Sequence, residues 1–154
     1  GVGVELRSQC AAQHSHRLHH VTRAGHAACH QIGMAADVLG ERVDDQVRAM
    51  LDMHNGGIQL VALSRGREGL LITDGKTCME GLLIMENVVN VMGCGDSLLA
   101  GMASVMSRSG DLESITRKGV ACGAANTQVI GAGFLDPGLV QQLEAQVDLR
   151  QIKI

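Results

Sequence analysis

The stretch Asn90-Val91-Met92-Gly93-Cys94-Gly95-Asp96-Ser97-Leu98-Leu99-Ala100-Gly101 organises the interpretation of the whole chain. A short apolar run leads into a Gly-x-Gly-Asp turn, and an unbroken pattern of small and apolar residues typical of a helix follows. Glycines at such a junction let the backbone approach a ligand closely, because no Cβ stands in the way. The first amides of a helix have no partner inside it and carry partial positive charge.

These properties predict an anion hole formed by Gly93, Cys94 and Gly95, with Asp96 at its mouth. Asp96 is the candidate general base, since phosphoryl transfer needs an acceptor hydroxyl whose proton is taken up. Its structural alternative is a carboxylate that only caps the helix. Cys94 could be reactive at a helix N-terminus, or it could be a small residue in a tight turn.

Composition excludes several classes of protein. The chain has 154 residues, which favours one domain with a real core, and a net charge of −3, which offers no basic surface for nucleic acid or an anionic membrane. One Phe and no Trp or Tyr leave no aromatic platform for stacking bases. No apolar run has the length of a membrane span. Five cysteines without a C-x-x-C pair indicate reduced thiols and a cytoplasmic protein.

The pattern from residue 43 onward predicts a helix followed by strands. A helix begins at Val43 and ends at Asn55-Gly56-Gly57, and continuous apolar residues predict buried strands at 58–64 and 70–73. Asp74-Gly75 predicts a hairpin turn into a weaker strand near 77–79. The run at 81–85 has no clear assignment.

The remainder of the chain predicts three helices and a strand. A helix follows Gly95 and stops at Gly110, Asp111 caps the next helix, and Asp136-Pro137 opens the last one. Residues 149–154 could form an edge strand.

Residues 1–33 differ from everything after them. Six of the seven histidines lie between His14 and His30, and no sustained period predicts an element there. Three interpretations compete: a metal site that uses His16, His20, Cys29 and His30; a solvated extension; or a segment that is not native to the fold, for which we expect few buried side chains. We treat 1–33 as unassigned and 34–154 as the domain.

The stretch around Asp96 resembles the second signature of the ribokinase family of sugar kinases, usually [D/N]-T-x-G-A-G-D-x-F-x-x-G. The positions that match are Asn90, Gly93, Gly95, Asp96 and Gly101, and those that depart are Val91, Cys94 and Leu98. The similarity is greatest to the phosphofructokinase-B group and extends over about residues 36–154, the C-terminal half of such a kinase. Counting back from Gly40 puts Gln31 and Met34 at the Asn and Glu of the family's K-P-N-x-x-E motif.

The resemblance implies a three-layer α/β fold, with a mostly parallel sheet flanked by helices. It implies ATP-dependent phosphorylation of a sugar phosphate, of the fructose 1-phosphate or tagatose 6-phosphate type, with Mg²⁺ bridging the nucleotide phosphates. It makes Asp96 the base and suggests a homodimer in the full-length parent.

The resemblance also implies nucleotide-binding residues. Ser64-Arg65-Gly66-x-x-Gly69 is similar to the family's segment against the nucleotide phosphates, and Asn126 lies where the family lines the adenine pocket. Gly131, with Gly133, would shape the loop beside that pocket. No residue is assigned as a metal ligand.

Two other functions compete with a kinase. A truncated, catalytically inactive nucleotide-binding remnant would bind ATP without sugar-dependent release of ADP. A Rossmann dehydrogenase is disfavoured, because no G-x-G-x-x-G follows a first strand with an acidic residue some distance beyond.

Overall fold

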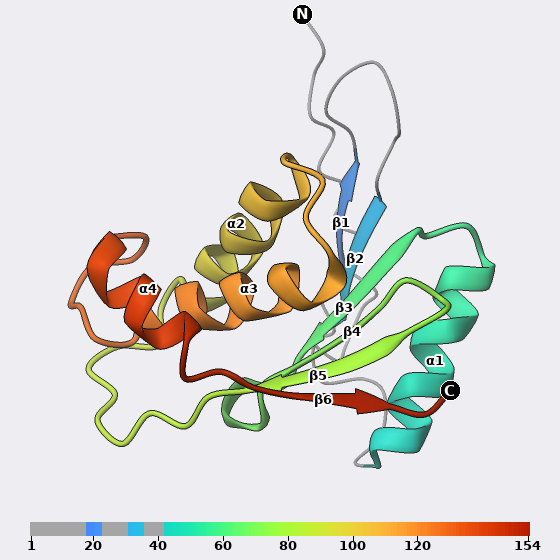
Figure 1. Ribbon diagram of the computed structural model, residues 1–154, viewed down its shortest axis with the longest axis horizontal. Coiled ribbons are helices and arrows are strands. Elements are labelled where there is room, and N and C mark those ends of the chain that lie inside the picture. The colour runs from blue at the N-terminus through green and yellow to red at the C-terminus, as the bar shows by residue number, and fades with distance from the viewer. Residues whose placement is uncertain (1–17, 23–30, 36–41) are drawn as a thin grey trace, which may run out of the picture. The chain divides into compact units, whose positions relative to one another are not determined.

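A computed structural model describes the backbone of residues 18–22 and 31–35 and all atoms of residues 42–154 (Figure 1). In the described ranges most strands come before residue 83 and most helices after it. In chain order the elements are β1 (Leu18–Thr22), β2 (Gln31–Ala35), α1 (Val43–Asn55), β3 (Leu60–Ser64), a 3-10 turn η1 (Gly66–Glu68), β4 (Leu70–Thr73), β5 (Cys78–Leu82), α2 (Cys94–Met106), α3 (Leu112–Asn126), α4 (Pro137–Glu144) and β6 (Asp148–Ile152).

The strands of the described ranges form one sheet in the order β1-β2-β3-β4-β5-β6. β2 runs parallel to β3, with Met34 opposite Ala62, whereas β1 runs antiparallel to β2. The prediction of a mostly parallel sheet is therefore not confirmed. Residues 65–69 and 74–77 are the only links from β3 to β4 and from β4 to β5. Such links are too short for a parallel crossover, so these neighbours run antiparallel.

Two strands lie in the region where the sequence predicted no element. β1 and β2 pair over five positions, from Leu18 opposite Ala35 to Thr22 opposite Gln31. β2 pairs with both β1 and β3. Such pairing joins separate segments, so the local sequence does not indicate it. The histidine metal site, the burial of residues 1–33 and the origin of that segment lie outside the described side chains.

The chain divides into two compact units. The first comprises Gly1–Arg65, Leu71–Cys78 and Ile152–Ile154, and the second comprises Gly66–Leu70 and Met79–Gln151. Each unit has its own buried residues, and each is described separately below.

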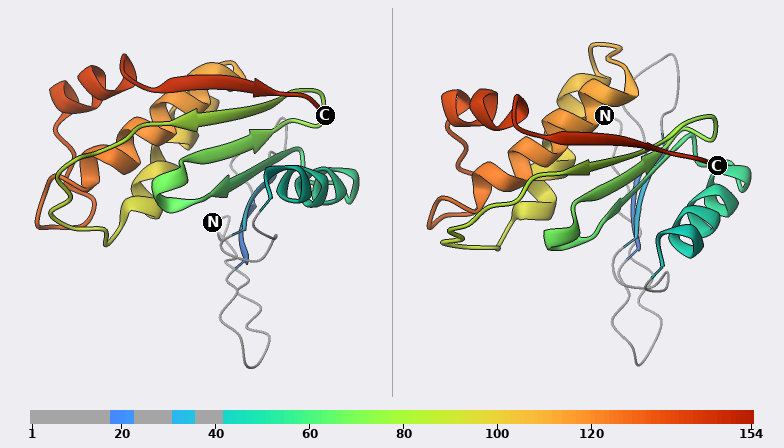
Figure 2. Two further views of the ribbon diagram at one scale, coloured as in Figure 1. Left: turned by 90° about the horizontal axis from the view of Figure 1, so that it is seen from below. Right: turned by 60° about the horizontal axis from the view of Figure 1, so that its bottom comes forward.

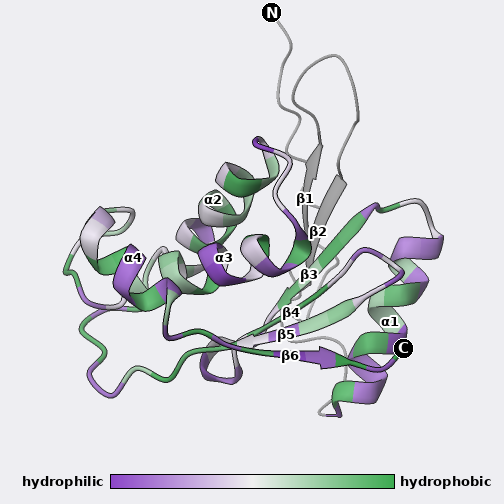
Figure 3. Cartoon of the chain, in the orientation of Figure 1, coloured by the Kyte–Doolittle hydropathy of each residue, from purple (hydrophilic) through white to green (hydrophobic). Residues whose placement is uncertain are grey.

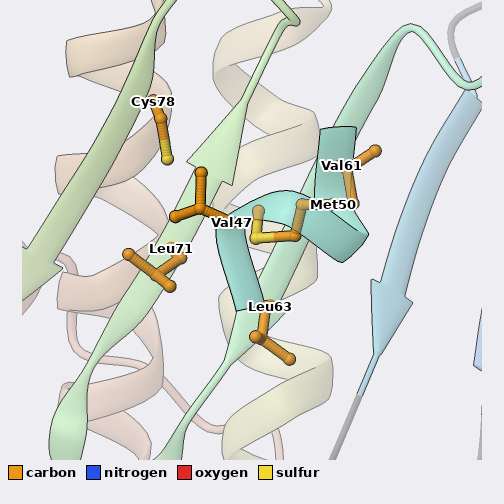
Figure 4. Close-up of a cluster of buried hydrophobic side chains, with 6 residues drawn as sticks. All are labelled: Val47, Met50, Val61, Leu63, Leu71 and Cys78. Atoms are coloured by element: carbon orange, nitrogen blue, oxygen red, sulfur yellow. The ribbon is translucent and has the colours of Figure 1, made fainter. Parts of the chain in front are cut away.

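An aliphatic cluster forms the core of the first unit (Figure 4). The buried face of α1 supplies Val47 and Met50, and Met50 has no exposed surface. The strands supply the other buried members of this cluster, namely Val61, Leu63, Leu71 and Cys78. The helical spacing from Val43 onward predicted this face correctly, because the apolar residues recur once per turn.

The hairpin predicted at Asp74-Gly75 is present between β4 and β5. Asp74 Oδ1 accepts hydrogen bonds from the amides of Lys76 at 2.9 Å and Thr77 at 2.8 Å. Gly75 has a φ of 83°, a left-handed conformation that glycine adopts without steric cost. β5 then continues to Leu82, so it includes part of the run at 81–85 that had no assignment.

In the second unit α3 packs directly on β5 and β6. A Cβ on Gly81 would lie 2.6 Å from Thr116, 3.1 Å from Val120 and 3.4 Å from Leu149. Arg117 adds a hydrogen bond of 2.7 Å from its guanidinium to the carbonyl of Val147. This close approach fixes the position of α3 on β5 and β6.

α2 and α3 touch through small residues, and Figure 2 shows them side by side in two further views. A Cβ on Gly101 would lie 2.8 Å from both Cys122 Sγ and the carbonyl of Lys118. A Cβ on Gly119 would lie 2.6 Å from Met102. Burial raises the pKa of the Cys122 thiol, so this side chain stays neutral in the interface.

The helix starts predicted at Asp111 and Asp136 are confirmed. Asp111 caps α3 by accepting a hydrogen bond from the amide of Ser114 at 2.7 Å. Asp136 caps α4 in the same way through Leu139 at 2.8 Å, with Pro137 in the first turn. Satisfying these amides fixes where each helix begins.

β6 is the last strand in the sheet order, as predicted for the C-terminal segment. Figure 3 shows β3 as mostly hydrophobic and β6 as mostly hydrophilic. The exposed Asp148, Arg150 and Gln151 account for this difference.

None of the helices in the described ranges has the length and apolar character needed to cross a bilayer. Cys78, Cys94 and Cys122, the cysteines that these ranges contain, form no disulfide.

We predict that Met50→Ala lowers the free energy of unfolding by about 2–5 kcal/mol, because it leaves a cavity in the cluster of the first unit. Urea denaturation measures this change. Met92→Ala is the matched control, since Met92 is 71% exposed and its truncation should change the value by less than about 0.5 kcal/mol. Equal losses in the two variants would contradict the assignment of this core.

We also predict that the Asp111 cap weakens in acid. Hydrogen bonds from the backbone and side chain of Ser114 hold the pKa of Asp111 below its ordinary 3.8. A carboxylate with a lowered pKa stabilises the folded state above its unfolded pKa and loses that contribution as the pH falls through its folded pKa. The difference in Tm between the wild type and Asp111→Ala should therefore be constant near neutral pH and shrink below 3.8. A difference that stays unchanged in acid would refute this account.

Candidate functional site

The Gly-x-Gly-Asp turn lies immediately before α2 in the second unit. Gly93 is the N-cap residue, and its φ of 81° is left-handed. A Cβ at this position would lie 2.8 Å from Cβ of Ala132, a contact that real side chains do not make. Gly93 is therefore required by both its backbone conformation and its close neighbour.

The first turn of α2 leaves amides directed away from the helix. Cys94 N donates to the carbonyl of Val91 at 3.4 Å, and Ser97 N donates to that of Gly93 at 2.9 Å. Within the described part of the chain, the intervening amides of Gly95 and Asp96 have no backbone acceptor. Gly95 is exposed, and a Cβ there would meet nothing within 4 Å. The turn thus offers two amides and open space, which suit an anion.

Asp96 lies in this first turn and is exposed. The N-cap position belongs to Gly93, and no side chain caps the helix, so Asp96 is not the cap that the alternative interpretation required. Its carboxylate makes no hydrogen bond or ion pair with other described residues. It remains available to a ligand. The role of Asp96 as a base stays a prediction.

Asn126 is the last residue of α3 and has no exposed surface. Its Nδ2 donates to the carbonyl of Met92 at 2.7 Å and contacts Cys94 Sγ at 3.4 Å. Its Oδ1 accepts from Ser97 Oγ at 3.1 Å and from Gly133 N at 2.8 Å. Both polar atoms are used within the chain, and direct contact with a nucleotide stays a prediction.

Residues 87–92 and 127–133 lie side by side around this turn. Val89 N donates to the carbonyl of Thr127 at 2.8 Å, and Asn90 Nδ2 donates to that of Ile130 at 3.3 Å. Large apolar side chains on and beside these segments are exposed, namely Val88, Val89, Val91, Met92, Ile130 and Phe134. The turn is therefore flanked by apolar surface.

The structure brings Gly93, Cys94, Gly95 and Asp96 together with Asn126, while Gly131 lies in the exposed loop that follows α3. Sequence reasoning did not identify Ser97 as a partner of Asn126. Their hydrogen bond joins positions 29 residues apart, and no local pattern signals it.

The segment from Ser64 to Gly69 is described by its own contacts. Ser64 ends β3 in the first unit, and Gly66 begins η1 in the second, with a φ of 60°. Gly69 has a φ of 87°, and a Cβ there would collide with the carbonyl of Gly81. Close packing against β5 thus accounts for Gly69 without a ligand. Nucleotide contacts by Ser64, Gly66 and Gly69 stay predictions.

Residues 42–154 contain no group of three or more His, Cys, Asp or Glu side chains placed to hold a metal ion. Mg²⁺ commonly binds through one or two carboxylates together with substrate phosphates and water. The exposed Asp96 beside an anion-binding turn is compatible with such a shared site.

Comparison with known proteins defines the class of this fold. The ribokinase of Arabidopsis thaliana, solved with ribose and ATP, superposes with a TM-score of 0.62 at 25% identity, over 68% of this chain and 35% of that one. Phosphofructokinase-2 of Escherichia coli, solved with substrates and products, gives a TM-score of 0.65 at 28% identity, over 70% and 35%. The chain therefore has a partial ribokinase-like α/β fold.

Residues 28–137 match the pfkB family carbohydrate kinase model, and the chain belongs to that family. The ATP-dependent 6-phosphofructokinase of Thermoanaerobacterium thermosaccharolyticum is 24% identical over 110 residues, which are 71% of this chain and 33% of that protein. The chain thus spans about a third of the length of this relative.

We predict opposite effects for alanine at the two glycines of the turn. Gly93→Ala should lower the free energy of unfolding by about 1–2 kcal/mol, because a left-handed alanine is strained and meets Ala132. Gly95→Ala should leave it unchanged or raise it by about 0.5–1 kcal/mol, because Gly95 is helical and faces open space. Urea denaturation of both variants tests the pair, and changes of the same sign would be inconsistent with this geometry.

Proposed function

We propose that this chain carries the nucleotide and catalytic-base part of an ATP-dependent kinase that phosphorylates a sugar phosphate. The observation that carries the proposal is the exposed Asp96 beside the unpaired amides of Gly95 and Asp96, in a chain of the pfkB family. The carboxylate of Asp96 repels the phosphates of a ligand bound at this turn, and a role in accepting a proton or sharing a cation would offset that repulsion.

In the proposed reaction the carboxylate of Asp96 accepts the proton of the acceptor hydroxyl as that oxygen bonds to the γ-phosphorus of ATP. The bond from the γ-phosphorus to the β,γ-bridging oxygen breaks, and ADP leaves. The amides of Gly95 and Asp96 stabilise the charge on the transferring phosphoryl group. They need no reorganisation, since the helix already directs them outward.

The apolar surface beside the turn supports a nucleotide as the ligand. Ile130 and Phe134 are 89% and 79% exposed, and they follow α3 close to Gly131. A nucleotide combines an apolar base with phosphates, so one ligand could cover this surface and reach the amides of the turn. Mg²⁺, when bound, would neutralise charge on the nucleotide phosphates.

The proposed acceptors are fructose 1-phosphate, tagatose 6-phosphate and fructose 6-phosphate, the last of which is bound in a solved structure of phosphofructokinase-2 of Escherichia coli. The proposal includes a cytoplasmic location, as the cysteine pattern of the sequence predicts. It also includes a homodimer of the full-length parent.

We predict that, in the reconstructed full-length parent kinase, Asp96→Asn lowers kcat for sugar-dependent release of ADP by about 10²–10⁴-fold and leaves the Kd for MgATP nearly unchanged. The amide keeps the shape of the side chain but cannot accept a proton. A coupled ADP assay with each of the three sugar phosphates, together with calorimetric titration of MgATP, measures both quantities.

The matched control is Asp44→Asn, which removes an exposed first-turn carboxylate from α1 instead of α2. It should leave kcat and Kd unchanged. Normal turnover by Asp96→Asn would exclude Asp96 as the base. A wild-type chain that binds MgATP but releases no ADP with any of the three sugars would support the inactive nucleotide-binding remnant instead.

A further inference from the structure

The side chain of Asn126 joins three separate segments of the second unit. Its partners are the Met92–Cys94 turn, Ser97 in the first turn of α2, and Gly133 in the loop after α3. We propose that Asn126 is a positioning residue that holds the Gly93–Asp96 turn and the 131–133 loop in one arrangement for ligand binding. The identity of the ligand in this inference rests on the proposed function, whereas the arrangement of the turn and the loop does not.

The hydrogen-bond capacity of the Asn126 amide is used completely. An amide side chain can donate two hydrogen bonds and accept two. Its Nδ2 faces two acceptors, Met92 O and Cys94 Sγ, and its Oδ1 faces two donors, Ser97 Oγ and Gly133 N. A carbonyl can only accept and a backbone amide can only donate, so the side chain has one orientation.

The same segments are also in steric contact. The position of a Cβ on Gly93 lies 2.8 Å from Ala132 and 3.7 Å from Asn126 Oδ1. The Gly93–Asp96 turn and the 131–133 loop are therefore in contact beside the buried side chain of Asn126. We expect a displacement of either segment to displace the other. Asn126 acts on the ligand through these segments, because it has no exposed surface of its own.

The neutrality of the side chain has an electrostatic reason. An aspartate at position 126 would keep the two acceptor contacts but lose both donors. It would also place a negative charge directly behind the amides that are proposed to bind phosphate. Burial of that charge is costly without a cationic partner. Asparagine is therefore suited to this position in a way that its acid is not.

The test is amide hydrogen exchange followed by NMR on the whole 154-residue chain, without ligand. Asn126→Ala should accelerate exchange by about fivefold or more at Gly133, whose amide loses its acceptor, and at Ser97, whose amide bonds to Gly93 in the turn that Asn126 holds. Asn126→Asp keeps the acceptor for Gly133 but loses the donors to Met92 and Cys94. It should therefore accelerate exchange at Ser97, whose amide bonds to Gly93 in the released turn, but not at Gly133. The amide of Ser114, which Asp111 caps, should be unaffected in both variants.

Gln146→Ala is the matched control, because it removes an exposed amide side chain bonded to the carbonyl of Gln142. It should change exchange at neither Gly133 nor Ser97. Unaltered exchange at Gly133 in Asn126→Ala would overturn the proposal. Equal acceleration at Gly133, Ser97 and Ser114 would also overturn it, because that pattern signals general destabilisation.

If Asn126→Ala fails to fold, the proposal can still be tested on the wild-type chain. The Nδ2 protons of Asn126 should exchange about fivefold or more slowly than the Nε2 protons of exposed Gln146. Equal rates would overturn the proposal.

A second measurement tests whether the positioning by Asn126 affects binding of MgATP. Asn126→Ala should raise the Kd for MgATP by about fivefold or more, and Gln146→Ala should leave it unchanged. An unchanged Kd in Asn126→Ala would refute the link to ligand binding. If the wild-type chain binds no MgATP, the nucleotide role fails, while the exchange pattern still decides whether Asn126 positions the turn.

Discussion

The close packing of α2 on α3 is the constraint on which the second unit depends. Gly101 and Gly119 leave no room for a side chain where the two helices meet, so the helix backbones approach as far as they can. That approach places the last residue of α3 next to the turn before α2. Asn126 can reach Met92 and Ser97 only because the two helices are held this near to each other.

The same contact explains why the candidate site combines rigid and open parts. Ser97, Met102 and Asn126 are buried and fixed by neighbours on both helices. Gly95 and Asp96, in the same turn as Ser97, are exposed. A turn that packs on buried residues and exposes its amides to solvent has little conformational freedom to lose when a ligand binds.

Sequence reasoning predicted the elements whose signals are local. The apolar spacing after Val43, the caps at Asp111 and Asp136 and the hairpin at Asp74 are each contained within a few residues, and each is present. β1 and β2 were not predicted, because strand pairing supplies what their own sequence lacks. The mostly parallel sheet was implied by the family resemblance, but the short links from β3 to β4 and from β4 to β5 set the direction of these strands.

The candidate site divides in the same way. The Gly-x-Gly-Asp pattern located the turn and Asp96, because the residues that form this turn are consecutive in the sequence. The hydrogen bonds of Asn126 to Met92 and Ser97 could not be predicted, because these partners are distant in sequence. Gly69 shows that one glycine can have two explanations. Its pattern predicted contact with the nucleotide phosphates, which stays a prediction, and close packing against Gly81 requires a glycine there in any case.

The polar character of β6 has a consequence for how the chain behaves among its own copies. An outer strand offers unpaired backbone groups to any strand that approaches it, and uncharged outer strands promote aggregation. β6 exposes Asp148 and Arg150, and Arg150 also forms an ion pair of 2.7 Å with Glu80 on the adjacent strand. A second β6 docked edge to edge would have to remove these charges from water, so the sheet is protected against growth from this side.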